Sequence, residues 1–461
     1  MSKIRFYAAM LAAKTIHLGL KILGRNASYL PGKAALMICG DCLRYFQLPE
    51  TVICVTGTNG KTTVSNLLTS VLRNCGYTVT NNSLGSNVQA GIATALIEDA
   101  SFTGRIRRDV AVLEVDERSS LLIYPYIRPT YLVCNNIMRD SVKRNAHTDF
   151  ISYVINQAIP AGVKMILNAD DILCAHLGKN NPERVYFGIS AEAPSDKTLP
   201  FLSDIVYCPE CGERLEAEYI RYNHIGRIYC PKCSYRTPEP DYAVSRIDRD
   251  HGCFTISHGG TDEQYKLVND NITNLYNLCG AVAVLREFGL PYEKIHDAFE
   301  SLKIVKSRFD SYRVGERELT IILAKGQNPV ACTGVMRYTA GRPGENKAVL
   351  ISLDDIGDNH NNSENVSWVF DTDYAYLADP SISQVIFIGK RCHDYYLRAL
   401  MAGVDAARMY AVNTWQQGVA SVDMAHCGDI YLLYDPYRGE EMKQIRGYFL
   451  SRMEEEKSNE D

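Results

Sequence analysis

The chain has 461 residues, of which 46% are hydrophobic and 22% charged, and its net charge is −5. This length allows two or three domains with sizeable cores, and the composition is that of a globular protein rather than a disordered or fibrous one. The acidic balance argues against a nucleic-acid-binding surface, which normally carries an excess of basic residues. Most of the fifteen cysteines stand singly inside apolar runs, as expected in a reducing cytoplasm.

Residues 1–48 are expected to form a helical segment ahead of the first α/β domain. Residues 6–23 are fairly apolar, but Lys14, His17 and Lys21 interrupt them, so the stretch is too polar for a membrane span. A turn at residues 29–32 and a second helix ending near Phe46 are predicted to follow. We expect the first helix to pack on the next domain, and a weak membrane-surface role is the alternative.

A nucleotide-binding loop is predicted at residues 56–63, Thr-Gly-Thr-Asn-Gly-Lys-Thr-Thr. A β-branched run before it predicts a buried strand, and apolar residues at helical spacing after it predict a helix. Backbone N–H groups at such a turn bind phosphate, Lys61 adds a cation, and the Thr62 hydroxyl can bind Mg²⁺. Only two residues separate its two glycines, fewer than in the general Walker pattern. The predicted phosphate-binding residues are Thr58, Asn59, Gly60, Lys61, Thr62 and Thr63.

Further strands are predicted at residues 110–115, 131–134 and 164–167, with helices between them. This alternation predicts a mainly parallel sheet that binds ligands at the C-terminal ends of its strands. The carboxylate cluster at residues 114–117 follows one such end, and Glu114 is predicted to be a Mg²⁺ ligand. An ordinary solvated strand end is the alternative.

Two Cys-x-x-Cys pairs, separated by 18 residues, give the clearest metal signal in the chain. Each pair can place two thiolates on one turn of a tetrahedral site, and four sulfur ligands leave no open position for catalysis. We therefore predict a structural zinc ribbon, inserted at residues 205–240, and a redox role for either pair is the alternative. The predicted ligands are Cys208, Cys211, Cys230 and Cys233.

The remaining chain is predicted to contain short strands at residues 241–268, a helix from Ile272, and a second α/β domain. Asn274 and Asn277 lie early in that helix, where they cap it or contact a nucleoside. The second domain is expected to open with a hairpin and to contain a long polar loop at residues 354–364. The predicted domains are the helical segment 1–48, the middle domain 49–304, the C-terminal domain 305–452 and a disordered tail 453–461.

The phosphate loop resembles that of the Mur ligases and folylpolyglutamate synthetases, which use ATP to activate a carboxylate as an acyl phosphate. Residues 168–171, Asn274 with Asn277, and residues 307–310 also resemble motifs of that superfamily. The resemblance implies a Mur ligase-like α/β fold and a site containing ATP and Mg²⁺. It places Asn274 near the adenosine, Arg308 against the nucleotide, and Lys61 and Glu114 in the catalytic machinery.

Within that superfamily the chain resembles the MurT family, on the four-cysteine ribbon, Arg139-Asp140, residues 323–329 and residues 367–371. This resemblance implies amidation of the D-glutamate α-carboxyl of lipid II, or of another muropeptide precursor, in cell wall biogenesis. It also implies a heterodimer in which a GatD-type glutamine amidotransferase supplies ammonia. From the net charge and the interrupted apolar N-terminus, we expect no nucleic acid and at most peripheral membrane contact. The expected location is the cytoplasm, and contact with the inner face of the cell membrane is left open.

The resemblance further implies that an aspartate of the C-terminal domain orients the catalytic histidine of the partner. Asp371 is the predicted residue, and a helix cap is its alternative role. The family shows an acidic, Gly-containing segment upstream of Ser367, whereas this chain has Asn-Asn-Ser-Glu-Asn at residues 361–365. The alternatives to this function are a stand-alone amino acid ligase and a non-catalytic ATP-binding scaffold.

Overall fold

The computed structural model describes residues 2–83, 86–140, 147–194, 196–197, 199, 203–268, 271–302, 309–324, 326–354 and 366–460. The chain divides into two compact units. The first contains residues 1–138 and 147–304, and the second contains residues 139–146 and 305–461.

The first unit is built on a nine-stranded sheet in the order β11-β10-β9-β6-β5-β4-β1-β3-β2. The strands from β2 to β9 in this order run parallel, and β10 and β11 extend the edge as antiparallel strands. Their bounds are β1 Thr51–Thr56, β2 Val79–Asn81, β3 Val110–Glu114, β4 Tyr131–Cys134, β5 Lys164–Asn168, β6 Arg184–Ile189, β9 Tyr242–Asp248, β10 Cys253–His258 and β11 Thr261–Lys266.

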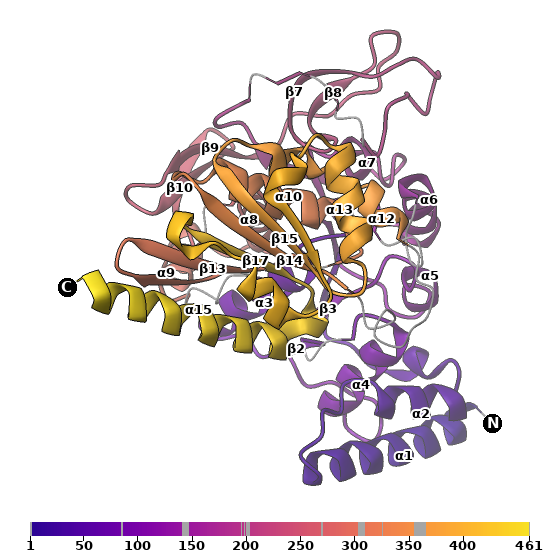
Figure 1. Cartoon of the computed structure of the whole chain (residues 1–461). Helices are drawn as coiled ribbons and strands as arrows, with labels where there is room; N and C mark the ends of the chain where they lie inside the picture. The colour runs from indigo at the N-terminus through magenta and orange to yellow at the C-terminus, as the bar shows by residue number, and fades with distance from the viewer. Residues whose placement is uncertain are drawn as a thin grey trace. The chain divides into compact units, whose positions relative to one another are not determined.

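Helices cover this sheet because its central strands are apolar on both faces and would otherwise expose them to water. The N-terminal helices pack on each other and on α4, as predicted for the first helix (Figure 1). The helices are α1 Ser2–Ile22, α2 Leu30–Ile38, α3 Lys61–Asn74, α4 Gln89–Asp99, α5 Ser120–Ile123, α6 Thr148–Ala158, α7 Ile172–Ala175, α8 Ile272–Glu287 and α9 Tyr292–Glu300.

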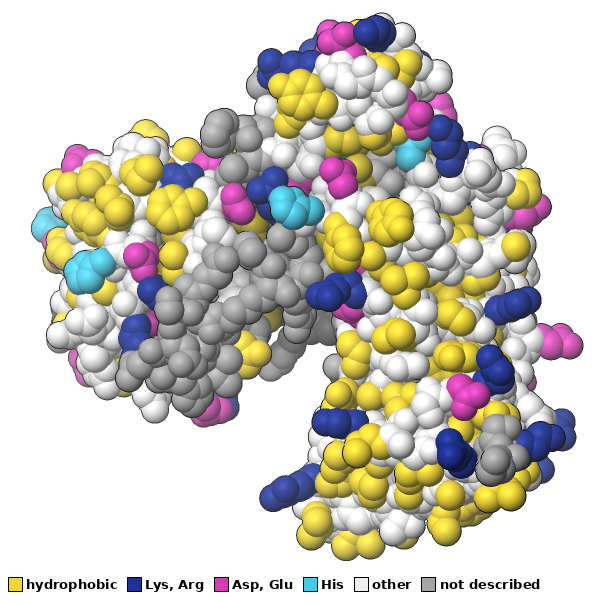
Figure 2. Space-filling view, turned by 90° about the vertical axis from the view of Figure 1, so that its right-hand side faces the viewer, with side chains coloured by type: hydrophobic (Ala, Val, Ile, Leu, Met, Phe, Trp, Pro, Cys, Tyr) yellow, Lys and Arg dark blue, Asp and Glu magenta, His cyan; other side chains and the backbone are white. Residues whose placement is uncertain are grey.

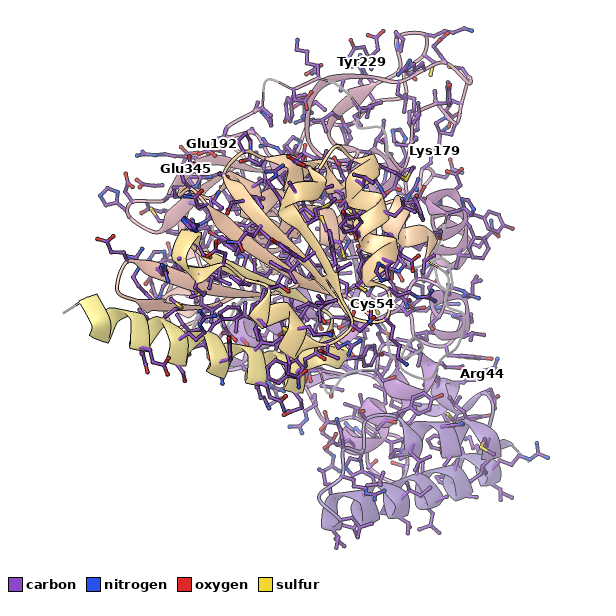
Figure 3. All side chains as sticks on the ribbon, viewed as in Figure 1. Arg44, Cys54, Lys179, Glu192, Tyr229 and Glu345 are labelled. Atoms are coloured by element: carbon purple, nitrogen blue, oxygen red, sulfur yellow. The ribbon has the colours of Figure 1, made fainter. Side chains whose placement is uncertain are left out.

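A separate two-stranded hairpin, β7 Glu216–Tyr222 and β8 Ile225–Tyr229, forms the ribbon between β6 and β9. It lies at the top of Figure 1, and Tyr229 at the end of β8 is labelled in Figure 3.

The second unit has a six-stranded sheet in the order β12-β13-β17-β14-β15-β16, parallel except for the β12–β13 hairpin. Helices pack on it around two apolar clusters. The strands are β12 Phe309–Val314, β13 Arg317–Leu323, β14 Lys347–Ser352, β15 Ile382–Ile388, β16 Met409–Val412 and β17 Ile430–Tyr434. The helices are α10 Pro329–Gly341, α12 Ser367–Phe370, α13 Cys392–Met401, α14 Trp415–Ala420 and α15 Gly439–Glu460.

The predicted fold class is confirmed, and two local predictions differ from the structure. The turn expected at residues 29–32 is the first turn of α2, where Pro31 is compatible with a helix because its missing N–H has no intrahelical acceptor there. Helix α15 continues to Glu460, across the tail expected to be disordered, since residues 453–457, Met-Glu-Glu-Glu-Lys, are all strong helix formers. None of the described helices is both long and apolar enough to cross a membrane.

Candidate nucleotide-binding site

The loop between β1 and α3 contains two glycines with positive φ, +116° at Gly57 and +84° at Gly60. A Cβ atom at Gly57 would lie 2.8 Å from the carbonyl oxygen of Asn136, and one at Gly60 would lie 2.1 Å from Oδ1 of Asn277. Both positions therefore require glycine, for backbone conformation and for space. The chain then enters α3 directly at Lys61.

The start of α3 offers donors to an anion. The first N–H groups of a helix have no intrahelical acceptors, and the helix dipole adds positive potential there. The side chains of Thr62 and Thr63 are exposed at this end. Next to the loop, the Thr56 hydroxyl is buried, has no hydrogen-bond partner among the described residues, and can donate. This arrangement fits a phosphate group.

The segment after β4 supports the loop. The N–H of Thr58 donates to the Asn136 carbonyl, and the N–H of Asn59 donates to Asn136 Oδ1, both at 2.9 Å. The Thr58 hydroxyl also exchanges hydrogen bonds with the backbone of Met138. Strands β1 and β4 are neighbours in the sheet. After β1 the chain continues to β2 on one side of this pair, whereas after β4 it continues to β5 on the other side. The loop therefore lies at a topological switch point, where open α/β sheets bind ligands.

The Lys61 ammonium is paired with a carboxylate. Its Nζ donates to Oε1 of Glu117 at 2.9 Å and also to the Gly57 carbonyl. The two side chains are 13% and 2% exposed. Burial alone would lower the pKa of Lys61, but the charge of Glu117 raises it, so the amine stays protonated. Burial raises the pKa of Glu117, and Lys61 opposes that shift.

Glu114, the predicted magnesium ligand, ends β3 directly beside Val55 of β1. Its carboxylate is half-buried and accepts a hydrogen bond from Asn87 Nδ2 at 3.0 Å. A carboxylate and the Thr62 hydroxyl at one sheet edge are a donor set that suits Mg²⁺. The sequence pattern does not single out Glu117, although this residue lies three positions after Glu114 in the predicted carboxylate cluster.

Asn277, rather than Asn274, reaches the phosphate loop. Its side chain is 9% exposed, and its Oδ1 accepts a hydrogen bond from Asn135 Nδ2 at 3.4 Å. Asn274 is half-buried in the first turn of α8. The predicted nucleotide contact Arg308 lies outside the described residues.

The four predicted zinc ligands converge in the ribbon. Their Sγ atoms all lie within 4.8 Å of one another, and three of the separations are 3.5, 3.6 and 3.7 Å. Four thiolates bound tetrahedrally to Zn²⁺ at about 2.3 Å lie about 3.8 Å apart. The cysteine cluster therefore fits a zinc ion with no open coordination position. Its members are Cys208, Cys211, Cys230 and Cys233.

Asp171, after β5, joins the ribbon to the wall of the phosphate loop. One carboxylate oxygen lies 3.1 Å from Nε2 of His224, which precedes β8, and both side chains are fully buried. The other oxygen accepts the N–H of Ile137 at 2.6 Å, in the segment after β4. One carboxylate thus fixes two segments that are distant in sequence.

Asp170 makes a second connection of this kind. Its Oδ2 accepts hydrogen bonds from the Tyr276 hydroxyl of α8 at 2.8 Å and the Ile189 N–H at 2.9 Å. Its Oδ1 lies 3.7 Å from Nε of Arg227 on β8. Burial raises the pKa of Asp170, and the positive charge of Arg227 opposes that shift. The ribbon is therefore attached to the sheet by buried charged groups rather than by its two chain connections alone.

In the second unit, Asp371 follows α12 and forms an ion pair with Arg139, with 3.3 Å between Oδ1 and NH1. Both side chains are about one-third exposed. Asp373, not Asp371, caps the following 3₁₀ helix by accepting the Ala375 N–H. The capping role considered for Asp371 is therefore absent, and the divergent residues 361–365 lie outside the described part of the chain.

Two family models match the chain. The Mur ligase middle domain matches residues 55–206, and the MurT ligase C-terminal domain matches residues 325–435. The MurT subunit of lipid II isoglutaminyl synthase (glutamine-hydrolyzing) from Staphylococcus aureus strain COL is 30% identical over 404 residues, 87% of this chain and 89% of that protein. The same-named subunit from Streptococcus pneumoniae strain R6 is 28% identical over 432 residues, 92% of this chain and 93% of that protein.

Solved structures share the fold. A pseudomurein peptide ligase type C from Methanothermus fervidus aligns with a TM-score of 0.65 and 20% identity, covering 89% of this chain and 81% of that one. MurF from Acinetobacter baumannii aligns with a TM-score of 0.62 and 16% identity, covering 90% and 80%. At these identities the likeness is one of architecture.

Proposed function

The chain belongs to the MurT family of Mur ligase-like proteins, and from this premise we propose that it is the ATP-using subunit of a two-component amidotransferase. The proposed acceptor is the α-carboxyl of D-glutamate in the stem peptide of lipid II. The observation that carries the proposal is the glycine-bounded loop at the switch point, which leads into a helix beginning at Lys61.

The proposed reaction has two steps. The acceptor carboxylate attacks the γ-phosphorus of ATP, which forms an acyl phosphate and releases ADP. Ammonia then attacks the acyl carbon, the carbon–oxygen bond to phosphate breaks, and the amide and inorganic phosphate are the products. Catalysis of this kind depends on positioning the reactants and neutralising charge.

The residues of the site fit these steps. The N–H groups at the start of α3 and the Lys61 ammonium would hold the phosphates, while Thr62 and Glu114 would hold Mg²⁺. Bound Mg²⁺ would neutralise charge on the transferred phosphoryl group. Since the reaction consumes ATP, we place it in the cytoplasm.

An amidation assay tests this proposal. The complex with a glutaminase subunit should convert D-glutamate to D-isoglutamine in stem peptides, as measured by mass spectrometry. Lys61→Ala should lower the rate by at least about a hundredfold, because it removes the cation at the transferred phosphate. Lys179→Ala is the matched control, since Lys179 forms an exposed ion pair with Glu210 and is labelled in Figure 3.

The assay also separates the alternatives. Unchanged amidation in Lys61→Ala would contradict an ATP-dependent mechanism and favour a scaffold. Incorporation of a free amino acid by the chain alone would indicate a stand-alone ligase instead.

We further propose that Asp371 orients the catalytic histidine of the glutaminase. Ammonium chloride can supply ammonia without the action of the glutaminase. Asp371→Asn should therefore lose amidation with glutamine as the nitrogen source and keep amidation with ammonium chloride. Asp373→Asn is the control, because Asp373 caps the 3₁₀ helix that follows it. Loss of both activities would show that Asp371 supports the fold through Arg139, and loss of neither would exclude the role.

We also propose that the cysteine cluster binds one structural Zn²⁺ per chain. Native mass spectrometry should detect this ion, and Cys211→Ser should abolish it. Cys253→Ser should keep the ion, since Cys253 lies on β10, outside the cluster. Zinc in both variants would contradict this assignment.

A further inference from the structure

We propose that the outer faces of α1 and α2 bind the surface of an anionic lipid bilayer. The inference deepens the proposed function, because an acceptor such as lipid II is itself anchored in a membrane. It rests on the apolar faces and the charge of residues 1–40, and these are independent of the nucleotide site.

Helix α1 has two apolar faces, whereas a helix on the surface of a globular protein normally has one. The first face is buried against α2 and α4 and contains Phe6, Ala9, Met10 and Ala13. The second points away from the protein. Its members recur at intervals of seven and four residues, so they form one stripe along the helix. They are Ile4, Leu11, Leu18 and Ile22, with exposed fractions of 74%, 61%, 59% and 77%.

Helix α2 also exposes apolar side chains. Leu30 is 50% exposed, Met37 80% and Ile38 39%. Nearly half of the large hydrophobic side chains that are exposed in the described structure lie in these first forty residues. Figure 2 shows yellow side chains gathered over the lower part of the molecule, where α1 and α2 lie. Exposed apolar surface of this extent indicates a binding face.

The charge of the same segment indicates what kind of surface these apolar faces bind. Residues 1–40 contain six Lys and Arg and no Asp or Glu, which leaves 43 basic against 54 acidic residues in the rest of the chain. Lys14 donates to carbonyls at the end of α4, and Lys21 pairs with Glu98. The other four form no ion pair among the described residues and stay available to a ligand; they are Lys3, Arg5, Arg25 and Lys33.

An apolar stripe flanked by unpaired cations is the pattern of a helix that lies in the interface of an anionic membrane. The apolar side chains enter the headgroup region while the cations contact lipid phosphates. A second copy of the same face would bring like charges together, so self-association is disfavoured. None of the described helices is both long and apolar enough to cross a membrane, so the proposed contact is with the bilayer surface.

Vesicle sedimentation of the full chain tests this proposal. The protein should pellet with vesicles containing phosphatidylglycerol, and much less with pure phosphatidylcholine vesicles or at high salt. Leu11→Glu and Leu18→Glu should each weaken partitioning by about tenfold or more, because a charged side chain replaces an inserted apolar one. Leu397→Glu on α13 is the matched control, since Leu397 is 50% exposed in the second unit.

Three results would overturn the proposal: no binding to either vesicle, equal binding to both, or binding that the α1 variants do not change. A dimer that dissociates in Leu18→Glu, without vesicle binding in the wild type, would identify a second copy as the occupant. Ammonia-dependent amidation of a water-soluble acceptor should be the same in Leu18→Glu and wild type. If neither protein shows this amidation but the wild type still binds vesicles, the proposed function is wrong and the membrane-binding proposal is retained.

Discussion

Lys61 is a cation that a ligand would neutralise, and Glu117 neutralises it in the ligand-free chain. Glu117→Gln should therefore destabilise the fold by about 2–4 kcal/mol, because it leaves a buried ammonium without its anion. Bound ATP would restore the balance, so the nucleotide should raise the melting temperature of the variant more than that of the wild type. Thermal unfolding with and without Mg·ATP measures both effects.

Glu192→Gln is the control for that experiment. Glu192 forms an ion pair with Arg249 in which both side chains are about half-exposed, so no buried cation is left unpaired when it is replaced. An equal nucleotide-induced shift in Glu117→Gln and wild type would contradict the charge-balancing role of Glu117.

Glu287, at the end of α8, gives stability a defined pH dependence. It accepts hydrogen bonds from Lys164 at 2.7 Å and Tyr242 at 2.9 Å. Burial alone would raise the pKa of Glu287, but these donors lower it below its ordinary value of 4.5. A depressed pKa stabilises the folded state above about pH 4.5, and this contribution is lost as the pH falls through the folded-state pKa.

Glu287→Gln should accordingly lower the free energy of unfolding by about 1–3 kcal/mol at neutral pH. Near pH 3 the difference from the wild type should shrink, because protonation has already weakened the wild-type contacts. Urea unfolding at the two pH values measures this. The same loss at both would show that charge at Glu287 is unimportant.

At the scale of elements, the phosphate loop leaves no room for a side chain at Gly60. Gly60 and the Gly76 that follows α3 have similar φ angles, +84° and +92°, but a Cβ at Gly76 would meet no atom within 4 Å. Gly76→Ala should thus cost about 1–2 kcal/mol of stability and leave ATP affinity unchanged. Gly60→Ala should weaken ATP binding by at least about a hundredfold, because its Cβ would displace Asn277 or the loop.

Calorimetric titration with Mg·ATP measures both affinities. If Gly60→Ala binds ATP as tightly as Gly76→Ala does, the close approach of Asn277 does not matter for the site.

The sequence predicted the elements and residues whose signal is local. The strand at 131–134 was predicted to the residue because a buried parallel strand is a short, continuous apolar run. Strand β2 has only three residues, and β6 begins with half-exposed side chains, so neither has that pattern. The cysteine cluster was predicted because its ligands come in two short, regular pairs.

The rest of the site depends on residues that are distant in the chain. Glu117 is 56 positions from Lys61, Asn136 is 77 from Asn59, and Asn277 is 142 from Asn135. Such pairs follow from the order of strands in the sheet, which sequence periodicity does not specify. The roles of Asp170 and Asp171 in attaching the ribbon were hidden for the same reason.

At the scale of the whole molecule, the two units have separate sheets and separate cores. Leu433→Ala on β17 should lower stability by about 2–5 kcal/mol, since the side chain is fully buried. ATP affinity should stay within about twofold of the wild type, because the phosphate loop belongs to the other unit. Val55→Ala, in β1 next to the phosphate loop, is expected to lower both the stability and the ATP affinity.

Calorimetry and nucleotide titration of the two variants test this independence. A large loss of ATP affinity in Leu433→Ala would show that the units are energetically coupled.

The ribbon also has a consequence for how the first unit folds. Strands β6 and β9 pair side by side, although the whole of residues 190–241 lies between them. Closing a long loop is entropically unfavourable, and the penalty falls when the intervening chain is already compact. If the ribbon folds early around the proposed zinc ion, it brings the ends of β6 and β9 together before these strands pair. Refolding of the first unit should then be faster with zinc present, because the folded ribbon speeds the pairing of β6 with β9.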